Sequence, residues 1–468
     1  METEQPQGNT RTVVLVITTL VTFMVPFMTA GVNIALPEIG SEFAMNAVVL
    51  GWVATAYFLA SSSLLVPFGR LADIYGRRKI FAAGAVIFAL GSILCIISRS
   101  EAFFIGSRAL QGIGGAMLLS TSIAMLTSVY PMKQRGNVLG INAGAAYLGL
   151  SAGPVIGGFL TSHAGWRSIF WLGFAIPFIT VVVVLWKLRS EWAGAKGERF
   201  DYGGSAIFAV SLIALIYGLT SLPDVLGAVL TLAGVMGFIA FAWWESHAGS
   251  PLIQLDLFKN NHAFVFSSVA TIISYAATYA VTFLISLYLQ YNKGLSPEKA
   301  GLVLLGTPAV QSVFSPIVGR LSDRIEPRIL ASAGMAVCTL GLGMLMFVAQ
   351  DTSLGYLVAS LLVLGVGLGL FASPNTNALM SSASKQWYGV ASAALATSRQ
   401  VGVMLSMGIT MLMLSTFVGR VVITPPYYGR FVDAVRIAFI VFTVLCFIGI
   451  FASLARGNVH KVEPGAQK

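Results

Sequence analysis

The sequence predicts an all-α membrane protein with fourteen spans, arranged as two six-helix bundles plus two extra transmembrane helices. Of its 468 residues, 56% are apolar and only 10% are charged, and the mean hydropathy is +0.83. A water-soluble chain carries about 25% charged residues, so this chain cannot cover a soluble surface of its own size. A short sequence that recurs 250 residues further along the chain indicates the two bundles.

Apolar runs of about 20 residues define the spans. The first six occupy residues 12–36, 47–68, 80–98, 102–128, 136–161 and 167–187. The others occupy 203–221, 225–243, 263–290, 299–318, 329–349, 354–380, 388–417 and 434–455. The first run is too long for the core of a signal peptide and has no small-residue cleavage site after it, so we expect it to be retained.

The order of the spans predicts three parts. We expect an N-terminal six-helix bundle over residues 1–190, two inserted transmembrane helices with their linkers over 191–259, and a C-terminal six-helix bundle with a cytoplasmic tail over 260–468.

The net charge of +10 (28 basic minus 18 acidic residues) is distributed among short loops. Because these loops form no continuous basic patch with interleaved aromatic residues, we expect no nucleic-acid partner. An even number of spans places both termini on the same side of the membrane. That side carries 19 basic residues, and the opposite side carries seven. The positive-inside rule therefore predicts a multi-pass protein of the cell membrane, inner or plasma, with both termini in the cytoplasm.

The repeat lies after the second span of each bundle. Residues Gly69–Arg78 and Gly319–Arg328 share Gly, Arg, Leu, Asp and the final Arg at five of ten positions. Secondary transporters are commonly built from such repeats, with substrate bound near mid-membrane where the repeats meet. The alternative, that cytoplasmic hairpins independently acquire these residues, explains five matches at one offset less well.

These residues resemble a known family. The segment Gly69–Lys79 is similar to the cytoplasmic loop signature of the major facilitator superfamily, and fourteen spans resemble its drug:proton antiporter branch. Similarity extends over most of the chain, to Arg108, Gln111 and Gly112, to Gly149, Gly153, Pro154, Gly157 and Gly158, to Trp166, Arg167, Ile169 and Phe170, and to Arg399, Gln400 and Gly402. The resemblance implies multidrug efflux by alternating access.

Two sets of residues are candidates for gating. The first set is expected to form a cytoplasmic latch and consists of Gly69, Arg70, Asp73, Arg77, Arg78, Gly319, Arg320 and Asp323. Asp73 can accept hydrogen bonds from a helix N-terminus or pair with Arg77 or Arg78. The alternative is a set of cations that serves only to orient the chain.

The second gating set lies in span 5. Gly149, Gly153 and Gly157 share one helix face, and Pro154 removes a backbone hydrogen bond, which together favour a hinge that seals the path against leaks. Small residues at this spacing are also ordinary packing elements in lipid.

Two arginines inside spans are the sharpest candidates for a substrate cavity. An Arg at the bilayer centre costs about 2.5 to 3.5 kcal/mol on insertion scales, so Arg108 and Arg399 are expected to face a cavity. Snorkelling to the interface is the alternative for Arg108, and pairing with backbone carbonyls is the alternative for Arg399. The other predicted cavity residues are Met28, Asn33, Tyr57, Gln111, Asn142, Tyr147, Gln311, Asn375, Asn377 and Gln400.

The sequence departs from the pattern of the resembling family at one position. An acidic residue is typical of the resembling branch five positions before the Asn of an Asn-x-Ala-Leu-Pro segment, and here Met28 occupies that place before Asn33. All acidic residues near spans lie at span ends or in loops, as do the histidines. Two interpretations therefore remain open. The protein couples export to protons, or it is a facilitator or exchanger of a neutral or anionic amphiphile.

Other classes of function are disfavoured. The sequence lacks the phosphate-binding motif of ATP-driven pumps and any cluster of a nucleophile with a base, so we expect neither an ATPase nor another enzyme. The solitary cysteines Cys95, Cys338 and Cys446 indicate no disulfide framework or metal site, and no cofactor is expected. We expect a monomer in the bilayer that moves an amphipathic small molecule, with protons as the candidate coupling ion.

Overall fold

The computed structural model describes residues 8–222, 224–249, 252, 261–322, 324–382 and 388–457. These residues contain fourteen helical segments long and apolar enough to cross a membrane, which confirms the predicted number of spans. The described residues form helices and connecting turns without a β-strand, as the prediction of an all-α membrane protein requires.

The first eight spans are single helices. They are α1 (Gly8–Glu42), α2 (Ala47–Tyr75), α3 (Arg77–Ile97), α4 (Glu101–Val129), α5 (Met132–Ala164), α6 (Arg167–Lys187), α7 (Tyr202–Ser221) and α8 (Val225–Glu245).

Three of the last six spans contain a break or a short preceding turn. The ninth span joins α9 (His262–Thr278) to α10 (Ala280–Tyr291), and the tenth joins α11 (Pro297–Leu304) to α12 (Gly306–Leu321). The remaining four are α13 (Pro327–Leu345), α14 (Leu354–Ser381), α15 (Tyr388–Phe417) and α16 (Tyr428–Ala455), the last preceded by the 3₁₀ turn η3 (Pro425–Tyr427).

The helices divide into two compact units by their contacts. Unit 1 comprises Met1–Leu215, Leu230–Leu252 and Gly294–Leu302, and unit 2 comprises Ile216–Val229, Ile253–Lys293 and Val303–Lys468. Helices α7 and α8 are therefore each shared between the units. The expected three-part division at residues 190/191 and 259/260 stays a prediction.

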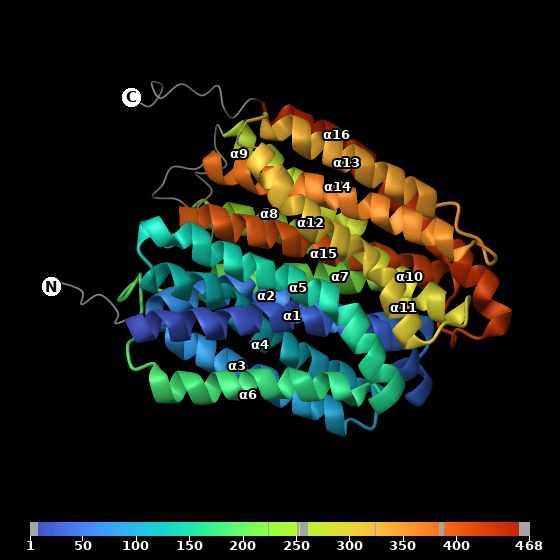
Figure 1. Cartoon of the computed structure of the whole chain (residues 1–468), viewed down its shortest axis with the longest axis horizontal. Helices are drawn as coiled ribbons and strands as arrows, with labels where there is room; N and C mark the ends of the chain where they lie inside the picture. The colour runs from blue at the N-terminus through green and yellow to red at the C-terminus, as the bar shows by residue number, and fades with distance from the viewer. Residues whose placement is uncertain are drawn as a thin grey trace. The chain divides into compact units, whose positions relative to one another are not determined.

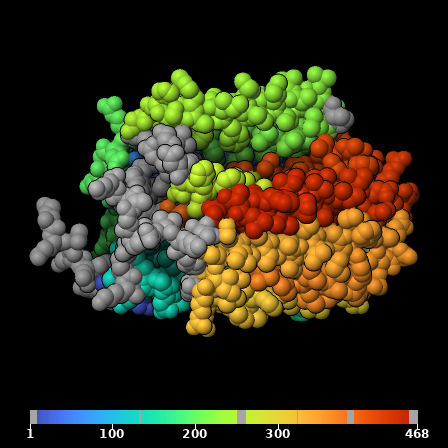
Figure 2. Space-filling model, turned by 90° about the horizontal axis from the view of Figure 1, so that it is seen from above, coloured from blue at the N-terminus to red at the C-terminus, as the bar shows by residue number. Residues whose placement is uncertain are grey.

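Each unit has its own helix packing. In unit 1, α1 packs along α5, and α4 packs against both α2 and α3. In unit 2, α14 packs against α12 and α13, α16 packs against α13, and α9 packs against α15 and α16 (Figure 1). Large apolar side chains remain exposed on the outside of helices, as on α16, whose Val444, Phe447 and Phe451 are more than half exposed (Figure 2, red). Exposed apolar side chains of this kind are expected on a helix surface that faces lipid.

The segment expected as a loop after the second span is helical. Residues Gly69–Tyr75 form the last turns of α2, and α3 begins at Arg77, so Gly76 alone separates the two helices. Its φ of +119° is a backbone conformation that other residues rarely adopt. The expectation placed the helix end too early because hydropathy marks only the part of a helix that lies in lipid. The counterpart Asp323 lies outside the described residues.

Candidate gating and substrate sites

A buried polar network surrounds Arg108 in unit 1. The side chain of Arg108 is 2% exposed, and its Nε donates to the carbonyl of Val53 at 3.2 Å. A second guanidinium nitrogen donates to the side-chain oxygen of Gln111, whose Nε2 in turn donates to Ser92 Oγ at 2.8 Å. The guanidinium carbon also lies 4.7 Å from the centre of the Tyr57 ring. These contacts join α2, α3 and α4 around one charge.

The other predicted cavity residues of unit 1 differ in their surroundings. Met28 is buried, and its thioether packs beside Gly173 of α6, where a Cβ would stand 2.7 Å from the Met28 methyl carbon. Asn33 is buried, and so is Asn142, whose Oδ1 accepts a hydrogen bond from Thr22 at 3.2 Å. Tyr147 is half-buried. That all of these line a substrate cavity stays a prediction.

The proposed latch contains an ion pair within one hairpin. Arg77 Nη2 lies 2.7 Å from Asp73 Oδ1, one helical turn before it, and its Nε donates to the same oxygen at 2.9 Å. Arg77 Nη1 also donates to the carbonyl of Ala124 at 3.0 Å and contacts Ser128. Arg77 therefore connects α2, α3 and α4. Gly69 lies near Ser120 of α4, where an added Cβ would make an ordinary contact of 3.6 Å.

The linker after α6 binds the same hairpin, a contact that the sequence did not predict. We call residues 188–201 the linker strap. The carbonyl of Trp192 accepts the backbone N–H of Arg77 at 2.8 Å, and the backbone N–H of Ala195 donates to the carbonyl of Asp73 at 2.9 Å. Arg70 also forms a 2.5 Å ion pair with Glu198 of the strap. The available signal was the placement of Glu191 and Glu198 in a linker that had a basic hairpin to pair with.

The glycines of α5 lie against α1. A Cβ on Gly149 would collide with the carbonyl of Phe23, and one on Gly157 would stand 2.6 Å from the Cα of Gly31. A Cβ on Gly153 would likewise come too close to Ala30 and Phe27 of α1. Pro154 lies on another face, where its carbonyl closely approaches Gly301 of α11 within unit 1. The stripe is thus a close helix contact, and its role as a hinge stays a prediction.

A pocket of about 450 Å³ lies where the end of α1 meets the start of α6, lined by Glu38, Ser41, Glu42, Ala164, Gly165, Trp166 and Arg167. Glu42 holds this corner together, because its carboxylate accepts from Arg167 at 2.6 and 2.7 Å and from the Trp166 indole at 2.7 Å. Arg167 also donates to the carbonyls of Ile96 and Ser98. The carboxylate of Glu42 and the guanidinium of Arg167 are therefore already hydrogen-bonded to other parts of the protein.

A second polar cluster lies in unit 2, on α9, α14 and α15. Arg399 is half-buried and donates to Thr376 Oγ1 at 3.1 Å, with the Tyr275 ring centre 5.9 Å from its guanidinium carbon. Asn375 is buried, and its Nδ2 donates to Thr271 Oγ1 at 2.7 Å and to the carbonyl of Ser267 at 3.3 Å. The structure thus brings two predicted residues, Arg399 and Asn375, to one three-helix junction.

The remaining predicted residues of unit 2 are spread along its helices. Asn377 donates to Ser322 Oγ at 3.1 Å, Gln311 is buried on α12, and Gln400 is half-buried next to Arg399. Gly319 faces Ser373, and Arg320 is exposed. Asn377 is therefore joined to the end of α12, whereas Arg399 is joined to α14 through Thr376.

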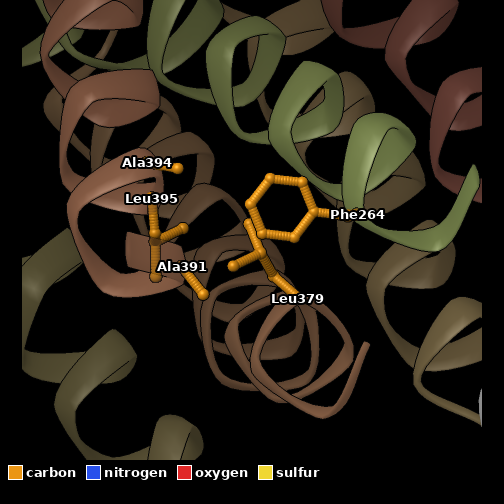
Figure 3. Packing of buried hydrophobic residues seen from close by; sticks show 5 residues of the cluster. All are labelled: Phe264, Leu379, Ala391, Ala394 and Leu395. Atoms are coloured by element: carbon orange, nitrogen blue, oxygen red, sulfur yellow. The ribbon is translucent and has the colours of Figure 1, made fainter. Parts of the chain in front are cut away.

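An apolar layer borders the polar junction. The buried side chains of Phe264, Leu379, Ala391, Ala394 and Leu395 pack together on the same three helices. Figure 3 shows the Phe264 ring of α9 directed toward Leu379 and toward the helix face that carries Ala391 and Leu395. Phe264 lies three residues before Ser267, and Leu395 lies four residues before Arg399, so about one helical turn separates the two layers.

Residues 18–407 and 267–467 match the sequence model of the Major Facilitator Superfamily. The chain belongs to this superfamily. It is 31% identical over 402 residues to the multidrug resistance protein Stp of Mycobacterium tuberculosis (strain CDC 1551 / Oshkosh), covering 84% of this chain and 74% of Stp. It is 30% identical over 389 residues to the riboflavin transporter RibZ of Clostridioides difficile (strain 630), and the match covers 83% of this chain and 85% of RibZ.

The fold has matches among solved structures. A bacterial homologue of the human lysosomal transporter Spinster, in an inward-facing and unoccupied conformation, superposes with a TM-score of 0.68 over 96% of this chain and 97% of that one. At 16% identity this likeness shows the fold alone. The major facilitator fold with fourteen spans is confirmed, and this membrane protein is a transporter of small molecules and not an enzyme.

Proposed function

We propose that this transporter exports hydrophobic or amphipathic compounds by alternating access and couples export to a proton gradient. The observation that carries the proposal is the family membership together with similarity to a multidrug resistance protein over 84% of the chain. The relative named as a riboflavin transporter supports a small-molecule substrate.

The proposed cavity residues are the two arginines and the polar side chains near them. The proposed gating elements are the Asp73–Arg77 pair, the linker strap and the α5 stripe. The chemical character of these residues supports both assignments. A few polar anchors in mainly apolar surroundings suit a lipophilic solute, and a pair that can break and reform suits a two-state latch.

One observation favours the alternative of a facilitator or exchanger for a neutral or anionic amphiphile without proton antiport. Each acidic side chain within the described helices lies within six residues of an end of its helix. The position where the resembling branch carries an acidic residue holds Met28, which packs beside Gly173. No described carboxylate is therefore deep in a span, where proton carriers commonly place one.

Substrate-dependent proton movement separates the two functions. Proteoliposomes that contain the purified protein and a trapped pH-sensitive dye are exposed to ethidium or to 8-anilinonaphthalene-1-sulfonate, and internal pH and counterflow are measured together. Counterflow with proton movement supports antiport. Counterflow at constant internal pH supports the facilitator, and the absence of both with a broad compound panel contradicts efflux.

The proposal includes a monomer in the cell membrane, inner or plasma, with both termini in the cytoplasm. The excess of basic residues on one side supports this orientation. Labelling of single cysteines introduced at Arg189 and Arg420 by a membrane-impermeant reagent tests it, because the proposed orientation leaves only the Arg420 position accessible from outside intact cells.

A further inference from the structure

Arg108 and Arg399 look alike in the sequence but differ in how much of their hydrogen-bonding capacity is used. Arg108 is 2% exposed, lies over Tyr57, and donates to both Val53 and Gln111. Arg399 is half-buried and, to the described residues, donates one hydrogen bond, which goes to Thr376. Its Nε is buried and has no hydrogen-bond partner among the residues that the structure describes. A guanidinium has five N–H donors, so Arg399 retains donors for a further acceptor.

Other polar atoms at this junction also lack partners. Within the described part of the chain, the side-chain oxygen of Asn375 and the hydroxyls of Ser267 and of its α9 neighbour Ser268 make no hydrogen bond, and each of these residues is at least nine-tenths buried. Most buried polar groups in native proteins have a partner, which can be a water molecule or a ligand. The helices that meet around Arg399 therefore carry further buried polar atoms with unused hydrogen-bonding capacity.

The junction is electropositive. The sequences of α9, α14 and α15 contain no Asp or Glu. Helix α16, which packs against α9 and α15, has one acidic residue, Asp433, and it is exposed in the first two turns. Among the described residues, none of the ion pairs includes Arg399. An anion brought to this guanidinium would meet no competing carboxylate from these helices.

The position of the junction suits a ligand within the membrane. Arg399 is the twelfth residue of α15, about 17 Å along the helix axis from its start. The apolar layer of Phe264, Leu379, Ala391, Ala394 and Leu395 lies one turn toward that start and makes the surroundings apolar on that side. Low local polarity strengthens the attraction between a guanidinium and an oxyanion.

We propose that Arg399 is the specificity-determining residue of a subsite in unit 2 that binds the oxyanion group, such as a carboxylate or sulfonate, of an amphipathic substrate. The inference rests on the proposed transport function and deepens it by naming the charge of the preferred substrates. Thr376 is a positioning residue that orients the guanidinium. Arg108 has no part in this subsite.

Two fluorescent probes that share the dansyl group test the proposal. Dansylglycine carries a carboxylate and dansylcholine carries a quaternary ammonium. Their binding to the purified full-length protein is measured by fluorescence anisotropy for the wild type, Arg399→Gln, Arg399→Lys and Arg420→Gln. Arg420 is exposed and paired with Asp224 at 3.6 Å, so its replacement is a matched control for the loss of one positive charge.

We expect the wild type to bind dansylglycine at least about tenfold more tightly than dansylcholine, because a charge-assisted hydrogen bond is worth this much. Arg399→Gln should abolish the preference, Arg399→Lys should restore part of it, and Arg420→Gln should leave it unchanged. Thr376→Val should weaken dansylglycine binding less than Arg399→Gln does.

A wild type that fails to prefer dansylglycine, or equal losses in Arg399→Gln and Arg420→Gln, would overturn the subsite. Export of dansylcholine in proteoliposomes separates this failure from failure of the proposed function. Export of the cation without binding of the anion leaves efflux standing and removes the oxyanion subsite.

Discussion

The Oε1 atom of Glu191 accepts the backbone N–H of Arg78 at 2.9 Å, so a side chain of the linker strap caps the N-terminus of α3. Gly76 occupies the N-cap position of α3 and supplies no side-chain acceptor. The strap therefore satisfies a backbone donor that the helix cannot satisfy itself. The proposed latch is consequently built from the hairpin and the strap together.

Replacing Glu191 should loosen the strap. Glu191→Ala removes the cap, and caps of this type are worth about 1 kcal/mol. We expect faster trypsin cleavage at Arg189, Lys196 and Arg199, which are exposed on the strap. Glu191→Gln keeps an acceptor oxygen and should be cleaved almost like the wild type. Equal cleavage of Glu191→Ala and wild type would show that the cap does not hold the strap.

The Asp73–Arg77 pair should show energetic coupling. Their partly buried side chains meet at 2.7 Å, and Arg77 also binds Ala124 and Ser128 of α4. In a double-mutant cycle of Asp73→Asn and Arg77→Gln, thermal unfolding should give a coupling energy of about 0.5 to 1 kcal/mol. Arg77→Gln should be the more destabilising single change because it also loses the contacts to α4. Additive effects would mean that the two charges do not act as a pair.

The glycine stripe of α5 offers a comparison on one helix. A Cβ at Gly157 would stand 2.6 Å from the Cα of Gly31, whereas a Cβ at Gly144 would meet none of the described residues within 4 Å. Gly157→Ala should lower stability by about 1 to 3 kcal/mol through overpacking. Gly144→Ala should raise stability by up to about 1 kcal/mol through helix propensity. Thermal unfolding in detergent measures both, and a neutral Gly157→Ala would refute the close contact with α1.

The sequence predicted the number and order of spans because burial in lipid leaves a long apolar signature. It placed the end of α2 too early, since the turns that hold Arg70 and Asp73 lie outside that signature. It also predicted a cavity for both Arg108 and Arg399 and could not show that their hydrogen bonding differs. Their difference depends on partners from distant segments, such as Val53 and Thr376, and no local pattern encodes those contacts.

That difference gives a prediction about stability. Arg108→Gln should leave the Val53 carbonyl without its guanidinium donor and the side chain of Gln111 without its charged partner. Hydrogen bonds to charged groups are worth about 1.5 to 3 kcal/mol, so the unfolding temperature should fall clearly. Arg399→Gln gives up one hydrogen bond from a half-buried side chain and should change the unfolding temperature much less. Thermal unfolding of both purified variants without substrate measures the contrast, and an equal fall would mean that Arg399 is as structural as Arg108.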